Sequence, residues 1–191
     1  MSRGAIDKSW LEAYLDRYRS SLFESAVHED LLLLRESMLR TRDRGGKVVL
    51  VGNGGSATIA DHCAVDFTKN ARVRSVSFGG AAWVSCLAND YGYENWVAKS
   101  LELYAAEGDL LILISSSGKS PNIINAATTA KELKIELTTF SGFDADNPLR
   151  KMGEQYFWVD SRAYNIVEMT HHIWLLAVCD SIIGTAEYSA S

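Results

Sequence analysis

The sequence predicts an α/β fold: a doubly wound parallel sheet in a flavodoxin-like three-layer sandwich, preceded by a helical extension. The first observation is that short apolar, β-branched runs alternate with helical segments from Gly46 onward. The second is that two of these runs, Val48–Val51 and Leu110–Ile114, pass directly into small polar turns followed by helical sequence. Strands joined through helices require right-handed crossovers and a parallel sheet covered on both faces.

The first 45 residues are expected to form two helices. Trp10, Leu11, Tyr14, Leu15 and Tyr18 recur with helical spacing, and the segment from Val27 to Met38 has the same periodicity. A polar, mostly charged segment and Gly45-Gly46 end the second helix. This is more helix than an α/β layer needs. We therefore divide the chain into residues 1–45, which pack against another subunit or cover an exposed sheet face, and residues 46–191, which form the α/β domain.

The remaining elements alternate along the chain. The pattern predicts strands at residues 47–51, 74–78, 109–114, 135–140 and 155–159. Helices are predicted at residues 56–69, 81–90, 95–106, 121–133 and 165–183. Ligands of such sheets bind beyond the carboxyl ends of the strands, where both polar turns fall.

Composition describes an ordinary globular chain of 191 residues, 47% apolar and 23% charged. A net charge of −5 without a basic stripe argues against nucleic-acid binding. No apolar run reaches the roughly 18 residues of a membrane span, and the polar start does not resemble a signal peptide. Cys63, Cys86 and Cys179 form no CxxC pair, which favours reduced cysteines and a cytoplasmic protein.

The two polar turns suit an anion better than a nucleotide. Gly52-x-Gly54-x-x-Ala57 matches a dinucleotide fingerprint, but the following strand ends Ser77-Phe78-Gly79 without the acid that would bind a ribose. Gly118-Lys119-Ser120 matches the end of a P-loop, but Leu113 stands where its first glycine belongs. The second turn carries four hydroxyls, at Ser115, Ser116, Ser117 and Ser120. One hydroxyl suffices to cap a helix, so the set indicates a neutral cradle for a phosphate monoester.

These turns carry a family resemblance. Gly52-Asn53-Gly54-Gly55-Ser56 together with Ser115-Ser116-Ser117-Gly118-Lys119-Ser120-Pro121-Asn122 resembles the sugar isomerase (SIS) domain, and with Asn89-Asp90 its phosphoheptose isomerase branch. The likeness covers nearly the whole chain. It implies that Ser56, Ser115, Ser117 and Ser120 hold a sugar phosphate, with Ser116 beside them. It also implies that Asn53, Gly54, Gly55, Asn89 and Asp90 contact the sugar chain.

The same resemblance implies a metal and base pair, His62 and Asp66, after the glycine turn. Residues four apart share a helix face, so the spacing is physically suitable, although a lone helical histidine is often structural. The closing helix departs from the family, because Val167 and Leu175 stand where a glutamine and a histidine complete the metal site. His171 lies midway on the same face and is expected to replace the missing imidazole, as a Zn²⁺ ligand or as a general acid. Alternatively, His171 and His172 are polar residues of a subunit interface.

Three functions remain open. The first is an aldose–ketose isomerase of a phosphorylated sugar, such as sedoheptulose 7-phosphate. It would act through an enediol, with Asp66 as base and a homotetramer formed through the first helices and Trp174, Leu175 and Leu176. The second is a non-catalytic SIS protein that binds a sugar phosphate and regulates or scaffolds a partner, as one relative associates with the replication initiator DnaA. The third, a nucleotide-binding enzyme, has the least support.

Overall fold

The computed structural model describes residues 6–23 and 26–189, and its centre is a five-stranded parallel sheet. The strand order is β2-β1-β3-β4-β5, the flavodoxin order, and every adjacent pair is parallel. This confirms the predicted fold class. The strands are β1 (Val48–Gly52), β2 (Ser75–Ser77), β3 (Leu110–Ser115), β4 (Glu136–Gly142) and β5 (Gln155–Val159).

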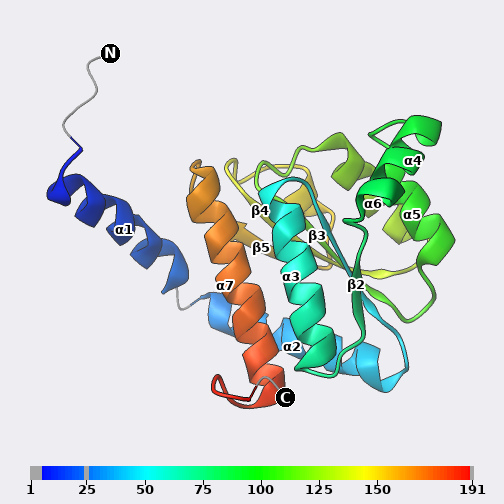
Figure 1. Cartoon of the computed structure of the whole chain (residues 1–191), viewed down its shortest axis with the longest axis horizontal. Helices are drawn as coiled ribbons and strands as arrows, with labels where there is room; N and C mark the ends of the chain where they lie inside the picture. Colours follow the sequence, from blue (N-terminus) through cyan, green and yellow to red (C-terminus); the bar gives the residue numbers. More distant parts are fainter. Residues whose placement is uncertain (1–5, 24–25, 190–191) are drawn as a thin grey trace.

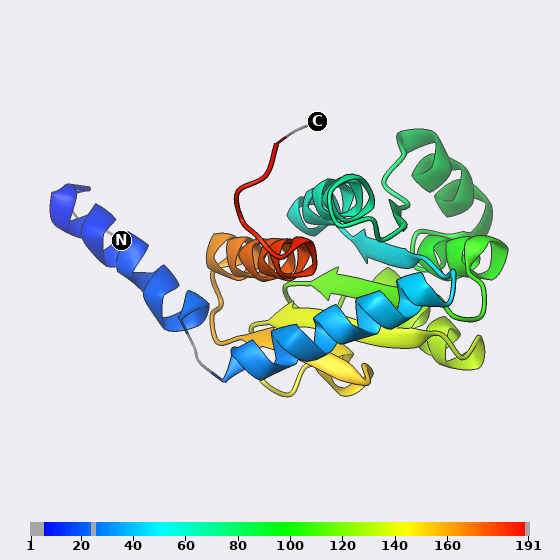
Figure 2. The ribbon, with the colours of Figure 1, turned by 90° about the horizontal axis from the view of Figure 1, so that it is seen from below.

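Helices cover both faces of the sheet (Figures 1 and 2). Alternate residues of β1 explain this, since Val48 and Leu50 pack with α2, α3 and α7 whereas Val49 and Val51 pack with α4, α5 and α6. One layer contains α2 (Val27–Asp43), α3 (Gly55–Lys69) and α7 (Tyr164–Ile183). The other contains α4 (Ala81–Tyr91), α5 (Trp96–Tyr104) and α6 (Pro121–Glu132). The structure adds one short 3₁₀ helix, η1 (Leu149–Lys151), that periodicity did not predict.

The two N-terminal helices behave differently. In α2, Leu34 and Met38 are fully buried against the core. By contrast α1 (Lys8–Leu22) has no buried residue and projects away from the sheet (Figures 1 and 2). Its contacts with α7 include hydrogen bonds from the Tyr18 hydroxyl to the Asn165 carbonyl and between the Ser21 and Thr170 hydroxyls. The division at residue 45 stays a prediction.

Helix α7 is the core of its layer. In the part of the chain that the structure describes, it is the one helix long and apolar enough to cross a membrane, but it packs against α2, α3 and β4. Trp174 is 5% exposed and Leu175 is fully buried. The prediction that these two side chains contact another subunit is therefore wrong, because they fill the core of their own chain. The large hydrophobic side chains that α7 exposes are Tyr164, Met169 and Ile173.

Candidate functional site

The glycine turn and the serine loop meet where the strand order reverses. They follow β1 and β3, which are adjacent and parallel, so both turns lie at the same edge of the sheet. A cavity of about 300 Å³ opens between them. It is lined by Asn53, Gly54, Gly55, Ser56, Ile114, Ser115, Ser116, Ser117, Ser120, Tyr164 and Glu168. The structure thus brings together every residue of the two turns that the sequence analysis assigned to ligand binding: Asn53, Gly54, Gly55, Ser56, Ser115, Ser116, Ser117 and Ser120. We refer to this cavity as the cradle.

A buried asparagine packs against the serine loop at Gly118. Gly118 has φ +62°, a left-handed conformation, and a Cβ there would collide with the Asn147 amide. Asn147 is 1% exposed and donates from Nδ2 to the Ser141 hydroxyl at 3.1 Å and to the Asp144 carbonyl at 2.8 Å. This asparagine was not anticipated, since its role depends on a contact across 29 residues of sequence. Backbone hydrogen bonds from Gly142 N to the Ser116 carbonyl and from Leu149 N to the Gly118 carbonyl tie the serine loop to the segment that Asn147 organises.

Hydrogen bonds within the chain use only part of the bonding capacity of the loop hydroxyls. Ser120 is the N-cap residue of α6 and Pro121 is the first helical residue, as predicted, but the Ser120 side chain makes no capping hydrogen bond. It accepts instead from the Ser115 hydroxyl at 3.2 Å. The Ser116 hydroxyl is buried without a partner among the described residues. Capping therefore does not account for the serines.

The cavity is rich in helix N-termini and contains no cation. Helices α3, α6 and α7 all begin at residues beside or within its wall, and helix N-termini attract anions. Lys119 belongs to the loop, but its ammonium lies 2.6 Å from a carboxylate oxygen of Asp144, which also pairs with Arg162. The hydrogen bond from Lys119, together with the charge of Arg162, lowers the pKa of Asp144. The charged side chain in the wall is an acid, Glu168, whose pKa is raised by burial.

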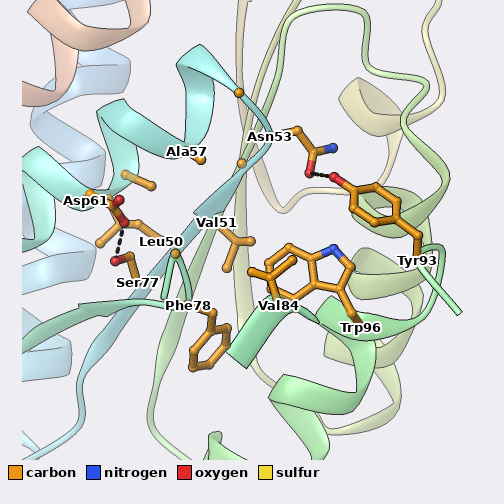
Figure 3. A pocket seen from close by; sticks show the side chains of 14 residues that line it. Leu50, Val51, Asn53, Ala57, Asp61, Ser77, Phe78, Val84, Tyr93 and Trp96 are labelled. Atoms are coloured by element: carbon orange, nitrogen blue, oxygen red, sulfur yellow. Dashed lines mark hydrogen bonds between the residues drawn. The ribbon is translucent and has the colours of Figure 1, made fainter. Parts of the chain in front are cut away.

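Asn53 is held between β1 and the opposite helical layer. Its amide exchanges two hydrogen bonds of 2.9 Å with Asn122 and accepts one of 3.1 Å from the Tyr93 hydroxyl. A second cavity, of about 160 Å³, lies on the far side of Asn53 (Figure 3). Its walls are mainly apolar, and its Asp61 carboxylate already accepts from Ser77 at 2.6 Å. The cavity on the serine-loop side therefore offers the freer polar groups.

Asn89 and Asp90 lie apart from both cavities. They stand near the end of α4, are exposed, and hydrogen-bond to each other at 2.9 Å. Neither lines either cavity. Within one chain, the structure does not bring these two residues to the cradle.

Beyond the cradle, α3 and α7 form a chain of three polar groups. Both helices begin at the cavity and run side by side (Figure 1). His62 Nε2 lies 3.2 Å from Asp66 Oδ2, and His62 Nδ1 lies 2.9 Å from His172 Nε2. Asn70 donates to the other Asp66 oxygen at 3.2 Å. With both of its oxygens engaged, Asp66 orients His62, which in turn accepts from His172. The pKa of His172 is lowered by burial and by His62, against an opposing effect of Asp66.

His171 lies elsewhere, in contrast to expectation. It is fully buried, packs against Phe140 and donates from Nε2 to the Ser141 carbonyl at 3.0 Å. Burial lowers its pKa to about 4. Successive helical residues are about 100° apart, so only one of the adjacent histidines can face α3. That residue is His172, which the sequence analysis considered only as a polar residue of a subunit interface.

The donor set does not fit the expected zinc ion. His171 points into the core, and Val167 and Leu175 are fully buried apolar residues without donor atoms. Within residues 6–23 and 26–189, no group of three or more His, Cys, Asp or Glu side chains is arranged to hold a metal. A catalytic zinc site usually has three protein ligands that converge on one point, whereas His62 uses one ring nitrogen toward Asp66 and the other toward His172, so these three side chains form a chain.

Comparison with known proteins now defines the class of protein. The SIS domain model matches residues 13–142, and the chain belongs to the SIS domain family of phosphosugar isomerases. Membership implies that it binds a sugar phosphate.

Its relatives are more specific. The chain is 30% identical over 189 residues to a phosphoheptose isomerase of Helicobacter pylori, covering 95% of this chain and 96% of the relative. It is 33% identical over 144 residues to a phosphoheptose isomerase of Fusobacterium nucleatum, covering 73% and 74%. The structure of phosphoheptose isomerase from Neisseria gonorrhoeae superimposes with a TM-score of 0.84 at 25% identity, covering 92% of this chain and 98% of that one.

Proposed function

We propose that this protein is an aldose–ketose isomerase of a phosphorylated sugar, and that the sugar is a seven-carbon one such as sedoheptulose 7-phosphate. One observation carries the proposal: a cavity lined by the hydroxyls of the serine loop lies at the start of α3 and α7, and the same two helices carry a pair of hydrogen-bonded histidines about two helical turns later. The names of the relatives support the seven-carbon substrate. We expect an extended sugar held by its phosphate to reach from the cavity to these histidines.

In this mechanism His172 moves the proton. Its Nε2 donates to His62, and its Nδ1 makes no hydrogen bond with residues 6–23 and 26–189, so Nδ1 is available to the substrate. The imidazole takes the proton from the hydroxyl-bearing carbon next to the carbonyl, the electron pair of that C–H bond forms the enediol double bond, and the carbonyl oxygen takes a proton from solvent. The imidazolium then returns its proton to the former carbonyl carbon, and the hydroxyl on the other carbon gives its proton to solvent as the new C=O bond forms. Asp66, predicted as the base, acts as the orienting carboxylate, and no step requires a metal.

A non-catalytic role is the second candidate, and the buried Val167 and Leu175 favour it. Such a protein binds a sugar phosphate as a signal. Incubation with sedoheptulose 7-phosphate, followed by NMR of the sugar, distinguishes the two. Appearance of an aldose supports the isomerase, whereas saturable binding without conversion of any heptose phosphate supports the regulator.

Removing one cradle hydroxyl should weaken binding. Ser120→Ala deletes a group that we expect to bond a charged phosphate oxygen, and such a loss costs roughly 1–3 kcal/mol, about tenfold to a hundredfold in affinity. Calorimetric titration with sedoheptulose 7-phosphate measures it. Ser85→Ala, on the exposed face of α4, is the matched control and should bind as the wild type does. Equal affinity of Ser120→Ala and wild type would remove Ser120 from the phosphate site.

We also propose a homo-oligomer, a tetramer, assembled through α1. Trp10, Leu11 and Leu15 are 45%, 52% and 64% exposed on a helix that the chain itself does not cover. Exposed apolar stripes of this kind mark interfaces in soluble proteins. Light scattering should give four times the chain mass for the wild type and a lower mass for Leu15→Glu, while Lys8→Glu serves as the control on the same helix. A monomeric wild type at micromolar concentration would contradict the assembly.

A further inference from the structure

Glu168 places a carboxylate inside the anion cradle. It comes from the second turn of α7, lines the same cavity as Ser56 and Ser115, and is only partly exposed. The carboxylate lies directly against Gly55, the first residue of α3, where any Cβ would collide with it. An acid at this point shares its space with the negative group that the cradle is built to receive.

No described residue neutralises Glu168. It makes no hydrogen bond or ion pair with the part of the chain that the structure describes, and the wall of the cavity carries no Lys or Arg. The nearest loop cation, Lys119, is held by Asp144. The titratable groups on the helices packed against α7 include His62 and Asp66 of α3 and Tyr14 and Tyr18 of α1, and α7 itself carries Tyr164 and His172. None of them is a source of its pKa shift, which comes from burial alone.

A dianionic phosphate and an ionised carboxylate repel each other when both lie in the same partly desolvated cavity. A protonated carboxyl, by contrast, is a hydrogen-bond donor. On this geometry, and building on the phosphate site of the proposed function, we propose that Glu168 takes up one proton from solvent when a phosphate group binds and donates it as a hydrogen bond to a phosphate oxygen. The ligand class is a tetrahedral oxyanion or its monoester. Partial burial raises the pKa of Glu168 in the free protein, which lowers the free-energy cost of taking up this proton.

Proton linkage determines the direction in which the affinity changes with pH. If binding takes up one proton, affinity falls about tenfold for each pH unit above the pKa of free Glu168, because the concentration of protons in solution falls tenfold. Sulfate is the best probe, since it has the shape and charge of the phosphate dianion but does not itself titrate near neutral pH. Any proton that accompanies sulfate binding therefore belongs to the protein.

The experiment compares wild type with Glu168→Gln, which keeps the size of the side chain and removes its titration. Calorimetric titrations with sulfate between pH 6 and 8 should show wild-type affinity falling about tenfold per pH unit. Glu168→Gln should bind with little dependence on pH and more tightly than wild type at pH 8. Titrations in two buffers of different ionisation enthalpy should count one proton taken up by wild type and none by Glu168→Gln. Glu29→Gln, exposed on α2, should behave as wild type.

Two results separate the possible failures. If sulfate binds wild type and Glu168→Gln with the same pH dependence and the same proton count, Glu168 does not take up the proton and the inference is wrong, while the cradle stands. If neither sulfate nor inorganic phosphate binds wild type at any pH in this range, the cradle assignment falls, and the proposed function falls with it.

Discussion

His172→Gln should lower the turnover of the sugar phosphate by roughly 10²–10⁴-fold, the usual contribution of a positioned general acid or base. The amide can still donate to His62 Nδ1, as His172 Nε2 does at 2.9 Å, but it cannot exchange a proton with a carbon. Binding through the serine cradle should change little, because the wall of that cavity does not include His172. The loss should therefore appear in kcat and not in the dissociation constant.

Kinetics and calorimetry on the same preparation make the comparison. His28→Gln removes an exposed histidine of α2 and is the matched control, with unchanged turnover expected. Asp66→Asn should give an intermediate loss, since it disturbs only the orientation of His62. Full activity of His172→Gln would show that the imidazole chain between α3 and α7 is structural.

The second large effect concerns stability, and it depends on His171. The pKa of this buried imidazole is lowered from 6.5 to about 4. At pH values between these two, the imidazole therefore binds a proton in the unfolded chain but not in the folded chain. Its contribution to stability is complete above about pH 6.5 and is lost as the pH falls toward 4. Between pH 7 and pH 5 the free energy of unfolding should drop by about 2 kcal/mol on account of this group.

Urea unfolding at several pH values, for wild type and His171→Gln, isolates this contribution. Other carboxylates titrate in both proteins, so the informative quantity is the difference in unfolding free energy. Wild type should lose its advantage over His171→Gln as the pH is lowered. A difference that is constant from pH 7 to pH 5 would mean that His171 is protonated in the folded protein, and hence not sealed in the core.

The sequence predicts most of the fold, because each strand is a short apolar run with a clear boundary. β5 was predicted at residues 155–159 and observed there, and α3 was one residue longer than predicted. The alternation of strands and helices leaves few arrangements for a parallel sheet. The 3₁₀ helix η1 was missed because three residues carry no periodicity, and the position of α1 was open because no residue of it is buried.

The candidate site likewise has one part that the sequence predicts and one part that it does not. The serine loop is continuous in sequence, so its chemistry could be recognised directly. The histidine pair joins two helices. Which histidine of α7 pairs with His62 depends on the rotation of α7 about its axis, and this rotation is determined by core packing. A signal was nevertheless present: Val167 and Leu175 flank His171 at four residues on either side, and such a face on an apolar helix turns toward the core. Glu168 and His172, also four apart, face the cradle and α3.

The two helices that leave the cradle side by side also fix a length. In the proposed mechanism the phosphate is held where α3 and α7 begin, and the reacting carbons must reach the imidazoles about two helical turns later. The distance between the two places is set by the helical backbone, so substitution of side chains does not change it. Adding a residue between the start of either helix and its histidine would move that histidine by about 1.5 Å and rotate it by about 100° around the helix axis. On this mechanism, a change of substrate length requires moving the histidines by whole helical turns, and we expect a sugar phosphate too short to span the interval to bind without being converted.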